Sequence, residues 1–385
     1  MIVGVDASNL STGGSATHLV ELLSAAQPQE HDISQVIVWG GKTILNQIED
    51  RLWLQKIHEP LLDKSLPIRL YWQLSKFDQK ARMKDCDILF IPGGSYFGSF
   101  RPFVTMSQNM LPFEWASIRR YGISWLVIKN LFLRRSLVVS FRRANGLVFL
   151  TEYAKAAISP FIASNRGMIT RIPHGVDERF RKEPKPQSPI TTYSSKSAFL
   201  LLYVSQVTPY KHQSQVIEAV SQLRQIGLPL ELELVGSIDH AEKKFSRSLS
   251  KWDPKREWIR FRGEVPFNTM HKIYQKADLF VFASSCENMP IVLLEAMAAG
   301  LPIASSNLGP MPEMLDNAAI FFDPNYPIEI ANAIKILVDD PYLREEKSWA
   351  SYEASKPYTW RRCAYETFDF IAKVGQCERE VKHVG

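Results

Sequence analysis

The chain has few cysteines, and their spacing excludes several classes of protein. Only four occur among 385 residues, and no two of them form a Cys-x-x-Cys pair. Small disulfide-stapled folds and cysteine zinc sites need denser or more regular spacing, so we expect neither. The reducing cytoplasm is the natural setting for such a protein. The four cysteines are Cys86, Cys286, Cys363 and Cys377.

Long apolar runs are also missing. No stretch approaches the roughly 18 apolar residues of a membrane-spanning helix, so we expect any membrane contact to be peripheral. The first ten residues, MIVGVDASNL, predict a strand and a turn rather than a signal peptide. With 45% hydrophobic and 22% charged residues, the composition is typical of a folded globular protein and not of a disordered chain or a coiled coil.

Short β-rich runs alternate with helical patterns along the chain. The runs IVGVDA, QVIVWG and GLVFLT in the first half, and AFLLLYVS and DLFVFA in the second, are each followed by a stretch that favours a helix. This order predicts parallel sheets covered by helices on both faces, which is an α/β fold. At roughly 150 residues per domain, the length suggests two to three domains.

A segment rich in Pro, Ser and Lys divides the chain into two halves of similar size. We predict an N-terminal domain over residues 1–180, a linker over 181–197, a second domain over 198–357, and a C-terminal helical segment over 358–385 that packs back onto the first domain. Ligands of open parallel sheets bind beyond the carboxyl ends of the strands. Two such domains facing each other would therefore form one cleft.

The stretch SSCENMPIVLLEAMAAG, residues 284–300, holds two carboxylates eight positions apart, Glu287 and Glu295. Proline suits a first helical turn, so Pro290 predicts that Glu287 precedes a helix and that Glu295 lies inside it. Free amides at a helix start favour an anion, whereas carboxylates accept hydroxyl groups well. A ligand with both phosphate and hydroxyl groups fits best, although an amphipathic helix with a solvated glutamate explains the spacing equally well.

Glu287 and Glu295, followed by AMAAG and LP, resemble the Glu-x7-Glu signature of the retaining glycosyltransferases of family 4 (group 1). Other segments resemble this family in the same order, among them IPHGVDERF, YVSQVTPYKH, LVGS and FRGEV. The likeness extends over nearly the whole chain. It implies the GT-B fold, with two Rossmann-like, doubly wound domains, the first for the acceptor and the second for a nucleotide sugar such as a UDP- or GDP-sugar.

The resemblance implies roles for single residues. Lys211 would neutralise the leaving diphosphate, Glu287 would accept hydroxyls of the transferred sugar, and Glu295 would accept the ribose hydroxyls. A solvated surface lysine is the plain alternative for Lys211. Backbone amides around Asn288 and its neighbours would approach the donor. The donor-binding residues expected from the resemblance are Gly13, Gly14, Gln206, Lys211, Glu287, Asn288, Met289, Ile291 and Glu295.

The Gly13-Gly14 turn lies between a strand and a helix and permits close backbone approach to a ligand. It lacks the lysine of a phosphate-binding P-loop and the GxGxxG pattern, so a plain turn is the alternative. His18, in the helix that follows, is expected to be packed rather than catalytic.

Two glutamines depart from the family pattern. Gln206 stands where an arginine usually precedes the lysine by five residues, and Gln108 stands where a histidine is common. Because glutamine does not shuttle protons, we expect Gln108 to occupy the catalytic position without acting as a base. The resemblance then implies front-face attack assisted by the leaving phosphate. We expect no metal cofactor.

The segment from Trp115 to Thr151 has seven basic residues and no Asp or Glu. A basic amphipathic helix of this kind can lie on an anionic membrane surface, and the first domain is the acceptor half by resemblance. A core helix with a solvated basic face is the alternative, and no nucleic-acid-binding fold is recognised. The candidate membrane or acceptor residues are Arg119, Arg120, Lys129, Arg134, Arg135, Arg142 and Arg143.

These observations predict a retaining, metal-independent hexosyltransferase. Its acceptor would be a glycan or a lipid-linked glycan of bacterial surface polysaccharide such as lipopolysaccharide, at the inner face of the cytoplasmic membrane. A glycosyltransferase-like scaffold without activity is one alternative, which the two glutamines favour. A GT-B phosphorylase or epimerase is another.

Overall fold

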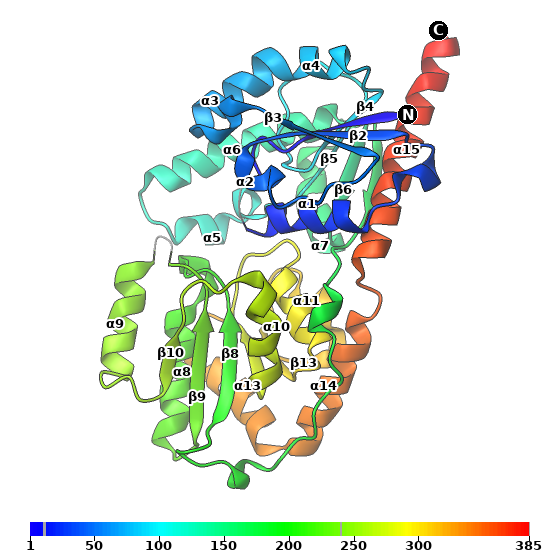
Figure 1. Cartoon of the computed structure of the whole chain (residues 1–385). Coiled ribbons are helices and arrows are strands. Elements are labelled where there is room, and N and C mark those ends of the chain that lie inside the picture. Colours follow the sequence, from blue (N-terminus) through cyan, green and yellow to red (C-terminus); the bar gives the residue numbers. More distant parts are fainter. Residues whose placement is uncertain (11–12, 239–240, 385) are drawn as a thin grey trace. The chain divides into compact units, whose positions relative to one another are not determined.

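The computed structural model describes residues 1–10, 13–238 and 241–384 (Figure 1). The chain divides into two compact α/β units, and each unit includes a segment from the other half of the sequence. Unit 1 contains Met1–Phe113, Ser124–Gly175 and the chain from Thr359 onward. Unit 2 contains Glu114–Ile123 and Val176–Tyr358.

Unit 1 is built on a parallel sheet with the strand order β3-β2-β1-β4-β5-β6-β7. The register places Val5 of β1 between Val38 of β2 and Phe90 of β4, and all three side chains are buried. Strands covered on both faces are expected to be mostly apolar. The inner strands are so, whereas the edge strands β3 and β7 contain polar residues and are partly buried or exposed. The strands are β1 (Ile2–Asp6), β2 (Gln35–Gly40), β3 (Leu54–His58), β4 (Ile88–Ile91), β5 (Phe103–Met106), β6 (Gly146–Phe149) and β7 (Met168–Arg171).

Helices connect and cover the strands of unit 1 (Figure 1). The C-terminal helix α15 (Trp360–Val384) packs against α1 and β6. A Cβ atom on Gly146 would lie 2.9 Å from the rings and methyls of Phe370 and Val374, so only glycine permits this contact. The other helices are α1 (Gly14–Ala25), α2 (Lys42–Leu45), α3 (Leu66–Trp72), α4 (Asp78–Met83), α6 (Trp125–Arg143) and α7 (Glu152–Ile158).

Unit 2 has a second parallel sheet, with the order β10-β9-β8-β11-β12-β13. Its central strands β8 and β11 are almost entirely buried, which explains their uninterrupted apolar sequences. The two sheets thus confirm the predicted α/β class. The strands are β8 (Phe199–Val204), β9 (Leu230–Val235), β10 (Ile259–Phe261), β11 (Leu279–Phe282), β12 (Ile303–Ser306) and β13 (Ala319–Phe322).

The helices of unit 2 include one short segment from the first half of the chain, α5. Arg120, which follows α5, donates a hydrogen bond to Asn325 Oδ1 at 2.6 Å, and this contact places Glu114–Ile123 in unit 2 rather than in the predicted domain 1–180. The helices are α5 (Trp115–Arg119), α8 (Gln213–Gln225), α9 (Glu242–Trp252), α10 (Phe267–Lys276), α11 (Ile291–Ala298), α12 (Met311–Leu315), α13 (Pro327–Asp339) and α14 (Pro341–Ser355).

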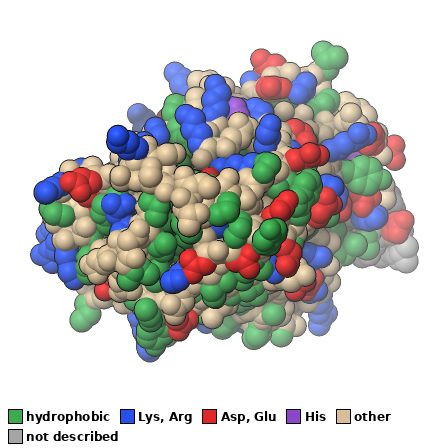
Figure 2. Space-filling model, turned by 90° about the horizontal axis from the view of Figure 1, so that it is seen from below, with side chains coloured by type: hydrophobic (Ala, Val, Ile, Leu, Met, Phe, Trp, Pro, Cys, Tyr) green, Lys and Arg blue, Asp and Glu red, His purple; other side chains and the backbone are tan. Residues whose placement is uncertain are grey.

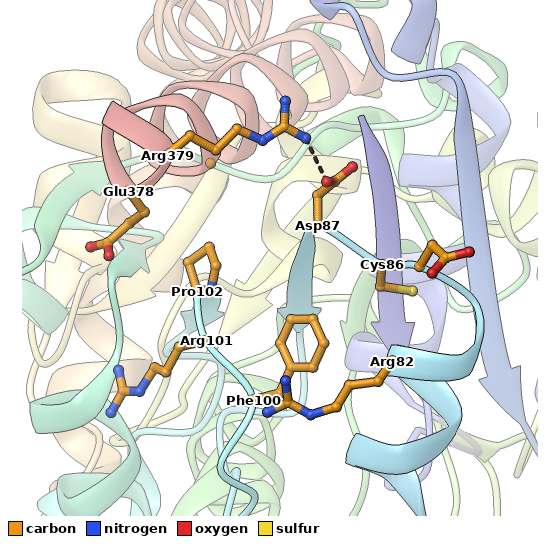
Figure 3. A pocket seen from close by; sticks show the side chains of 10 residues that line it. Arg82, Cys86, Asp87, Phe100, Arg101, Pro102, Glu378 and Arg379 are labelled. Atoms are coloured by element: carbon orange, nitrogen blue, oxygen red, sulfur yellow. Dashed lines mark ion pairs between the residues drawn. The ribbon is translucent and has the colours of Figure 1, made fainter. Parts of the chain in front are cut away.

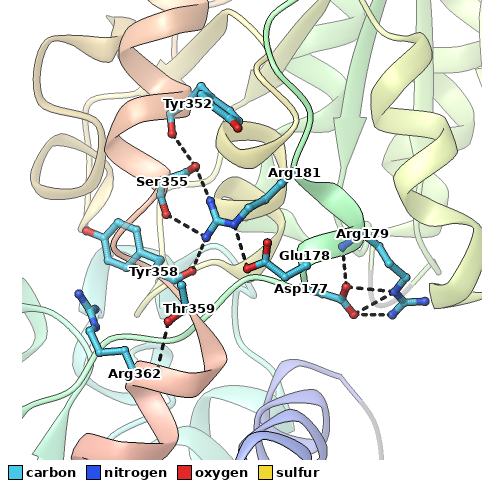
Figure 4. A network of polar contacts seen from close by, with 9 residues as sticks. All are labelled: Asp177, Glu178, Arg179, Arg181, Tyr352, Ser355, Tyr358, Thr359 and Arg362. Carbon is cyan, nitrogen blue, oxygen red and sulfur yellow. Dashed lines mark hydrogen bonds and ion pairs between the residues drawn. The ribbon is translucent and has the colours of Figure 1, made fainter.

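The segment 181–197, predicted to be a linker, is part of unit 2. Arg181 donates hydrogen bonds to Ser355 Oγ (3.2 Å) and to the carbonyl oxygen of Tyr358 (3.0 Å), and it pairs with Glu178 (Figure 4). Lys185 forms an ion pair with Asp278 at 2.6 Å. The chain passes between the units at residues 175–176, a few residues before the predicted boundary at 180. Sequence composition missed these contacts because they are made with distant residues.

Candidate active site

The strand order of unit 2 reverses between β8 and β11, which lie side by side in the middle of the sheet. In open α/β sheets, ligands bind beyond the carboxyl ends of the strands at this switch point. Lys211 follows β8 and Glu287 follows β11, and their side chains form an ion pair there. The sequence elements that were predicted to hold a diphosphate and a sugar therefore meet at the expected place in the sheet.

The ion pair is largely shielded from water. The side chains of Lys211 and Glu287 are 12% and 13% exposed. Burial lowers the pKa of Lys211 and is the largest single effect, but the nearby Glu287 carboxylate and Tyr203 together raise it by more, so the pKa lies above its ordinary value and the ammonium stays charged. Tyr203 holds the loop by donating to the carbonyl oxygen of Lys211 at 2.5 Å. The site thus presents a fixed, partly neutralised positive charge.

The residue after this lysine has a backbone conformation that the sequence did not suggest. His212 has φ of 55°, in the left-handed region, and it is the residue from which α8 begins. Its Nε2 lies 3.1 Å from Ser285 Oγ, in the loop that leads to Glu287. Burial lowers the pKa of His212 to about 3. The neutral imidazole therefore joins the two loops of the site.

Glu295 lies inside α11, and Glu287 precedes this helix, as the proline predicted. The Glu295 side chain is buried and accepts a hydrogen bond from the hydroxyl of Tyr274 at 2.8 Å. Burial raises the pKa of Glu295 to about 8, although the Tyr274 hydrogen bond works in the opposite direction. At neutral pH the carboxyl group is thus mostly protonated in this state of the protein.

Asn288, Met289 and Ile291 surround the start of α11. Asn288 and Met289 are buried, Pro290 is the N-cap residue, and Ile291 is the first residue of the helix. The first amides of a helix lack partners within it, so this turn provides N–H groups beside the Lys211–Glu287 pair. The predicted donor-binding residues of the second half are thus brought together in unit 2.

Gln206 also belongs to this region. It follows β8 and is exposed, and its carbonyl oxygen accepts a hydrogen bond from Gln213 Nε2 at 3.0 Å. The close approach of Gly236 to Ser205, where a Cβ atom would lie 2.1 Å from the carbonyl oxygen, further fixes this loop. The side chain of Gln206 replaces a charged group with a neutral one at the edge of the site.

The remaining predicted catalytic and donor-binding residues, Gln108, Gly13 and Gly14, lie in unit 1. Gln108 follows β5, and its Nε2 lies 3.1 Å from the sulfur of Met106. Gly13 is the N-cap residue of α1, with φ of 76°, and a Cβ atom on either Gly13 or Gly14 would meet nothing within 4 Å. Open space at both glycines leaves the backbone at the start of α1 accessible.

His18 is packed, as predicted. It is buried, and its Nδ1 lies 2.9 Å from Nδ1 of His174. Both rings lie close to Trp360 at the start of α15. Burial lowers the pKa of His18 to about 3. The pair therefore has a structural role at neutral pH.

The seven basic residues that the sequence grouped belong to two different units. Arg119 lies over the ring of Trp115 and belongs, with Arg120, to unit 2. The other five are on α6 in unit 1. Arg134 lies 4.2 Å above the ring of Phe161, Arg142 donates to the Phe161 carbonyl oxygen (2.8 Å), and Arg143 donates to that of Gly98 (2.7 Å). Lys129 and Arg135 instead line a groove. The seven residues thus differ in their contacts, and their role at a membrane or an acceptor stays a prediction.

Basic residues also gather on α9, which the sequence analysis did not single out. Lys243, Lys244, Arg247 and Lys251 are all exposed there. Figure 2 shows many Lys and Arg side chains toward the left of one face, mixed with hydrophobic side chains. Within the described part of the chain, no helix is both long and apolar enough to cross a membrane.

A pocket of unit 1 lies at the amino ends of β4 and β5 and contains the triplet Asp85-Cys86-Asp87 (Figure 3). The triplet is an Asp-x-Asp motif, which the expectation of metal-independent transfer wrongly took to be absent from the sequence. Asp87 pairs with Arg379 at 2.5 Å and accepts from the backbone N–H of Ile2 at 2.6 Å, so it anchors α15 and the first strand. Among residues 1–10, 13–238 and 241–384, no three His, Cys, Asp or Glu side chains form a group that could hold a metal ion.

Part of the chain is similar to known glycosyltransferases. Residues 190–355, which contain Lys211, Glu287 and Glu295, match the family model described as glycosyl transferases group 1. O-antigen chain mannosyltransferase B of Escherichia coli is 31% identical over 112 residues, which cover 29% of each chain. The chain thus spans less than a third of the length of this relative.

Solved structures resemble the whole chain. Sucrose-phosphate synthase from Thermosynechococcus elongatus superposes with a TM-score of 0.74 at 16% identity and covers 100% of both chains. Anabaena Alr3699/HepE, solved with UDP-glucose, superposes with a TM-score of 0.68 at 16% identity and covers 99% of this chain and 100% of its own. The fold of the chain is therefore GT-B, and its residues 190–355 carry the likeness to the group 1 glycosyl transferases.

Proposed function

We propose that this protein is a glycosyltransferase of family 4 that transfers a hexosyl residue from a nucleoside diphosphate sugar with retention of configuration. The Lys211–Glu287 ion pair at the switch point of unit 2 is the observation that carries this proposal. The ammonium of Lys211 and the carboxylate of Glu287 lie side by side. In such a donor the diphosphate is joined to the sugar ring, so the ammonium can bind the phosphate while the carboxylate accepts the sugar hydroxyls. The match of residues 190–355 to group 1 glycosyl transferases supports it.

In the free protein, Glu287 neutralises Lys211. A bound diphosphate would form an ion pair with the Lys211 ammonium. The Glu287 carboxylate would then be able to accept hydrogen bonds from the hydroxyls of the sugar. Glu295, deeper in α11, would accept the ribose hydroxyls. The solved relative of the same fold that holds UDP-glucose supports a uridine donor.

The transfer step needs no protein base in this arrangement. The bond between the anomeric carbon and the diphosphate oxygen breaks, the acceptor oxygen bonds to the same face of that carbon, and the acceptor proton passes to the leaving phosphate. Lys211 stabilises the charge that develops on that phosphate. Gln108 would orient the sugar by hydrogen bonds, since an amide cannot take the proton. No metal ion is assigned a role.

The acceptor is proposed to be a glycan, free or lipid-linked, of bacterial surface polysaccharide. The similarity to an O-antigen chain mannosyltransferase supports this class. Transfer would take place at the cytoplasmic face of the membrane, to which the protein would bind peripherally.

A donor screen tests the proposal. The full chain is incubated with UDP-, GDP- and ADP-sugars and a pool of lipid-linked glycans, and released nucleoside diphosphate is measured together with elongated glycan. Donor-dependent elongation that is lost in Lys211→Ala is expected. If calorimetry detects no binding of any of these donors or of the free diphosphates, a scaffold without activity explains the protein better.

A further inference from the structure

Unit 1 has a switch point of its own. Its strand order reverses between β1 and β4, which pair in the middle of the sheet. Asn9 follows β1, and Gly93 and Ser95 follow β4. The corresponding position in unit 2 holds the Lys211–Glu287 pair. By the same topological rule, unit 1 is expected to bind a ligand here.

A groove of about 650 Å³ opens at this point. This volume lies within the range of small-molecule sites. The helices α3 and α6 form its walls, and most of the lining is apolar. None of the lining residues is Asp or Glu. The lining residues are Asn9, Leu66, Arg69, Leu70, Gly93, Ser95, Phe97, Trp125, Lys129, Phe132, Leu133, Arg135, Ser136 and Val139.

Large apolar side chains of the groove are left in contact with water. Trp125 is 70% exposed and Phe132 is 65% exposed, and Leu66 on the opposite wall is also exposed. A contiguous apolar surface of this kind usually marks a binding site, because water contact with it is unfavourable. The ligand should therefore bring a hydrocarbon part.

Polar groups at the inner end of the groove have unused hydrogen-bonding capacity. Arg69 donates to the carbonyl oxygen of Ser8 at 3.2 Å, but its buried Nε has no partner among the described residues. The same holds for Oδ1 of Asn9. Lys129 and Arg135 add two further positive charges to the lining. Oδ1 of Asn9 is an acceptor, whereas Arg69 Nε and the charged groups of Lys129 and Arg135 are donors. An anionic oxygen group would satisfy these donors, and a phosphate does so well because guanidinium groups bind it with charge-assisted hydrogen bonds.

We propose that this groove binds the lipid part of a lipid-linked acceptor, with the hydrocarbon chain between α3 and α6 and the phosphate at Arg69. The assignment as an acceptor rests on the proposed function, whereas the binding of an anionic lipid does not. Charge complementarity selects this occupant: the groove combines apolar walls with three cationic side chains and no acidic one. A second copy of the chain, or a neutral hydrophobic ligand, would leave those charges without a counterion.

Photo-crosslinking tests the inference directly. A benzophenone analogue of farnesyl phosphate is added to the full chain without nucleotide sugar, and labelled peptides are identified. Labelling of α3 or α6 is expected. Farnesyl phosphate should compete at least tenfold better than farnesol, and inorganic phosphate should not compete. Labels confined to other elements, or equal competition by phosphate and alcohol, contradict the proposal.

Variants separate groove binding from general hydrophobicity. Phe132→Asp should lower labelling at least tenfold, and Val139→Trp, which fills the groove without adding charge, should do the same. Ile336→Asp, at an exposed position of α13 in unit 2, is the matched control and should label normally. Thermal melts establish that the variants fold. If phosphatidylglycerol vesicles compete as well as farnesyl phosphate, the groove is a general membrane contact and the proposed occupant is wrong.

The two proposals fail separately. Lys211→Ala should abolish sugar transfer and leave crosslinking intact. Crosslinking without any transfer by the wild type would contradict the proposed function and leave the groove assignment standing. Normal transfer to a lipid-linked glycan by Phe132→Asp and Val139→Trp would contradict the groove assignment alone.

Discussion

Lys211 and Glu287 lie 76 residues apart in the sequence and form an ion pair at the point where the sheet of unit 2 reverses its order. Each reaches this point from the loop that follows one of two adjacent central strands. The ion pair is not the only contact that fixes these loops, because Tyr203 holds the Lys211 loop and the contact of His212 with Ser285 joins the two loops to each other. The proposed donor site rests on this pair and on its position at the switch point.

Lys211→Ala should lower kcat/KM for sugar transfer by about 100-fold or more, because stabilisation of the leaving phosphate is lost. Lys335→Ala is the control: Lys335 pairs with Asp339 on the exposed surface of α13 and should contribute little to stability and nothing to transfer. Initial rates at varied donor concentration provide the measurement. Equal rates for Lys211→Ala and wild type would contradict the proposal that Lys211 stabilises the leaving phosphate.

Nucleotide binding should release a proton at pH 7. Burial raises the pKa of Glu295 to about 8, so the free carboxyl is mostly protonated at pH 7. Ribose hydroxyls donate to the carboxylate and favour ionisation, so binding lowers this pKa. Calorimetry with UDP in two buffers of different ionisation enthalpy should show release of close to one proton. Glu295→Gln should abolish it, and no buffer dependence in the wild type would contradict the ribose assignment.

Stability should respond to pH through the same group. Since the pKa of Glu295 is raised above its ordinary value of 4.5, the protonated form stabilises the fold, and this contribution is lost as pH rises from about 4.5 through 8. Thermal melts of the free protein should show a smaller decrease between pH 5 and pH 8 for Glu295→Gln than for the wild type. A decrease of the same size in both proteins would assign the pH effect to other groups.

Tyr274→Phe should weaken UDP binding and shift its pH dependence to higher pH. The Tyr274 hydroxyl lowers the pKa of Glu295 through a 2.8 Å hydrogen bond, so its loss makes ionisation harder. The unpaired buried carboxyl should also cost about 1–3 kcal/mol of stability. The pH profile of UDP affinity distinguishes this role from simple packing, because a packing defect would weaken binding equally at every pH.

The alternation of apolar and helical segments predicted both sheets and the order of their elements, since buried parallel strands require continuous apolar runs. The position of Glu287 before α11 and Glu295 within it followed from Pro290, a local signal. Tyr274 could not be recognised in this way. It precedes Glu295 by 21 residues, and only the packing of α10 on α11 brings the hydroxyl to the carboxyl.

The basic segment from Trp115 to Thr151 has contacts that sequence patterns could not predict. Helical spacing correctly predicted a long helix, α6, but it could not show that the chain enters unit 2 for residues 114–123. It also could not show that Arg142 and Arg143 donate to backbone carbonyl groups whereas Lys129 and Arg135 line the groove. Such differences depend on contacts with residues far away in the sequence.

The two glycines at the start of α1, Gly13 and Gly14, allow backbone strain and ligand access to be tested separately. Gly13→Ala should cost about 1 kcal/mol or more, because φ of 76° is unfavourable for alanine. Gly14→Ala faces open space and should leave the melting temperature unchanged or slightly higher. A fall in transfer rate for Gly14→Ala without loss of stability would support close approach of a ligand to this turn. An unchanged rate would make it a plain turn.

Anionic vesicles should distinguish the basic residues of α6 by their contacts. Lys129→Glu with Arg135→Glu should reduce flotation of the protein with vesicles containing phosphatidylglycerol, because each residue near such a surface contributes about 1 kcal/mol. Arg142→Gln should leave flotation unchanged and instead lower the melting temperature, since it removes the 2.8 Å hydrogen bond to the Phe161 carbonyl oxygen. If both variants float like the wild type, α6 makes no electrostatic contact with a membrane, and peripheral binding would have to involve another basic surface, such as the exposed side of α9.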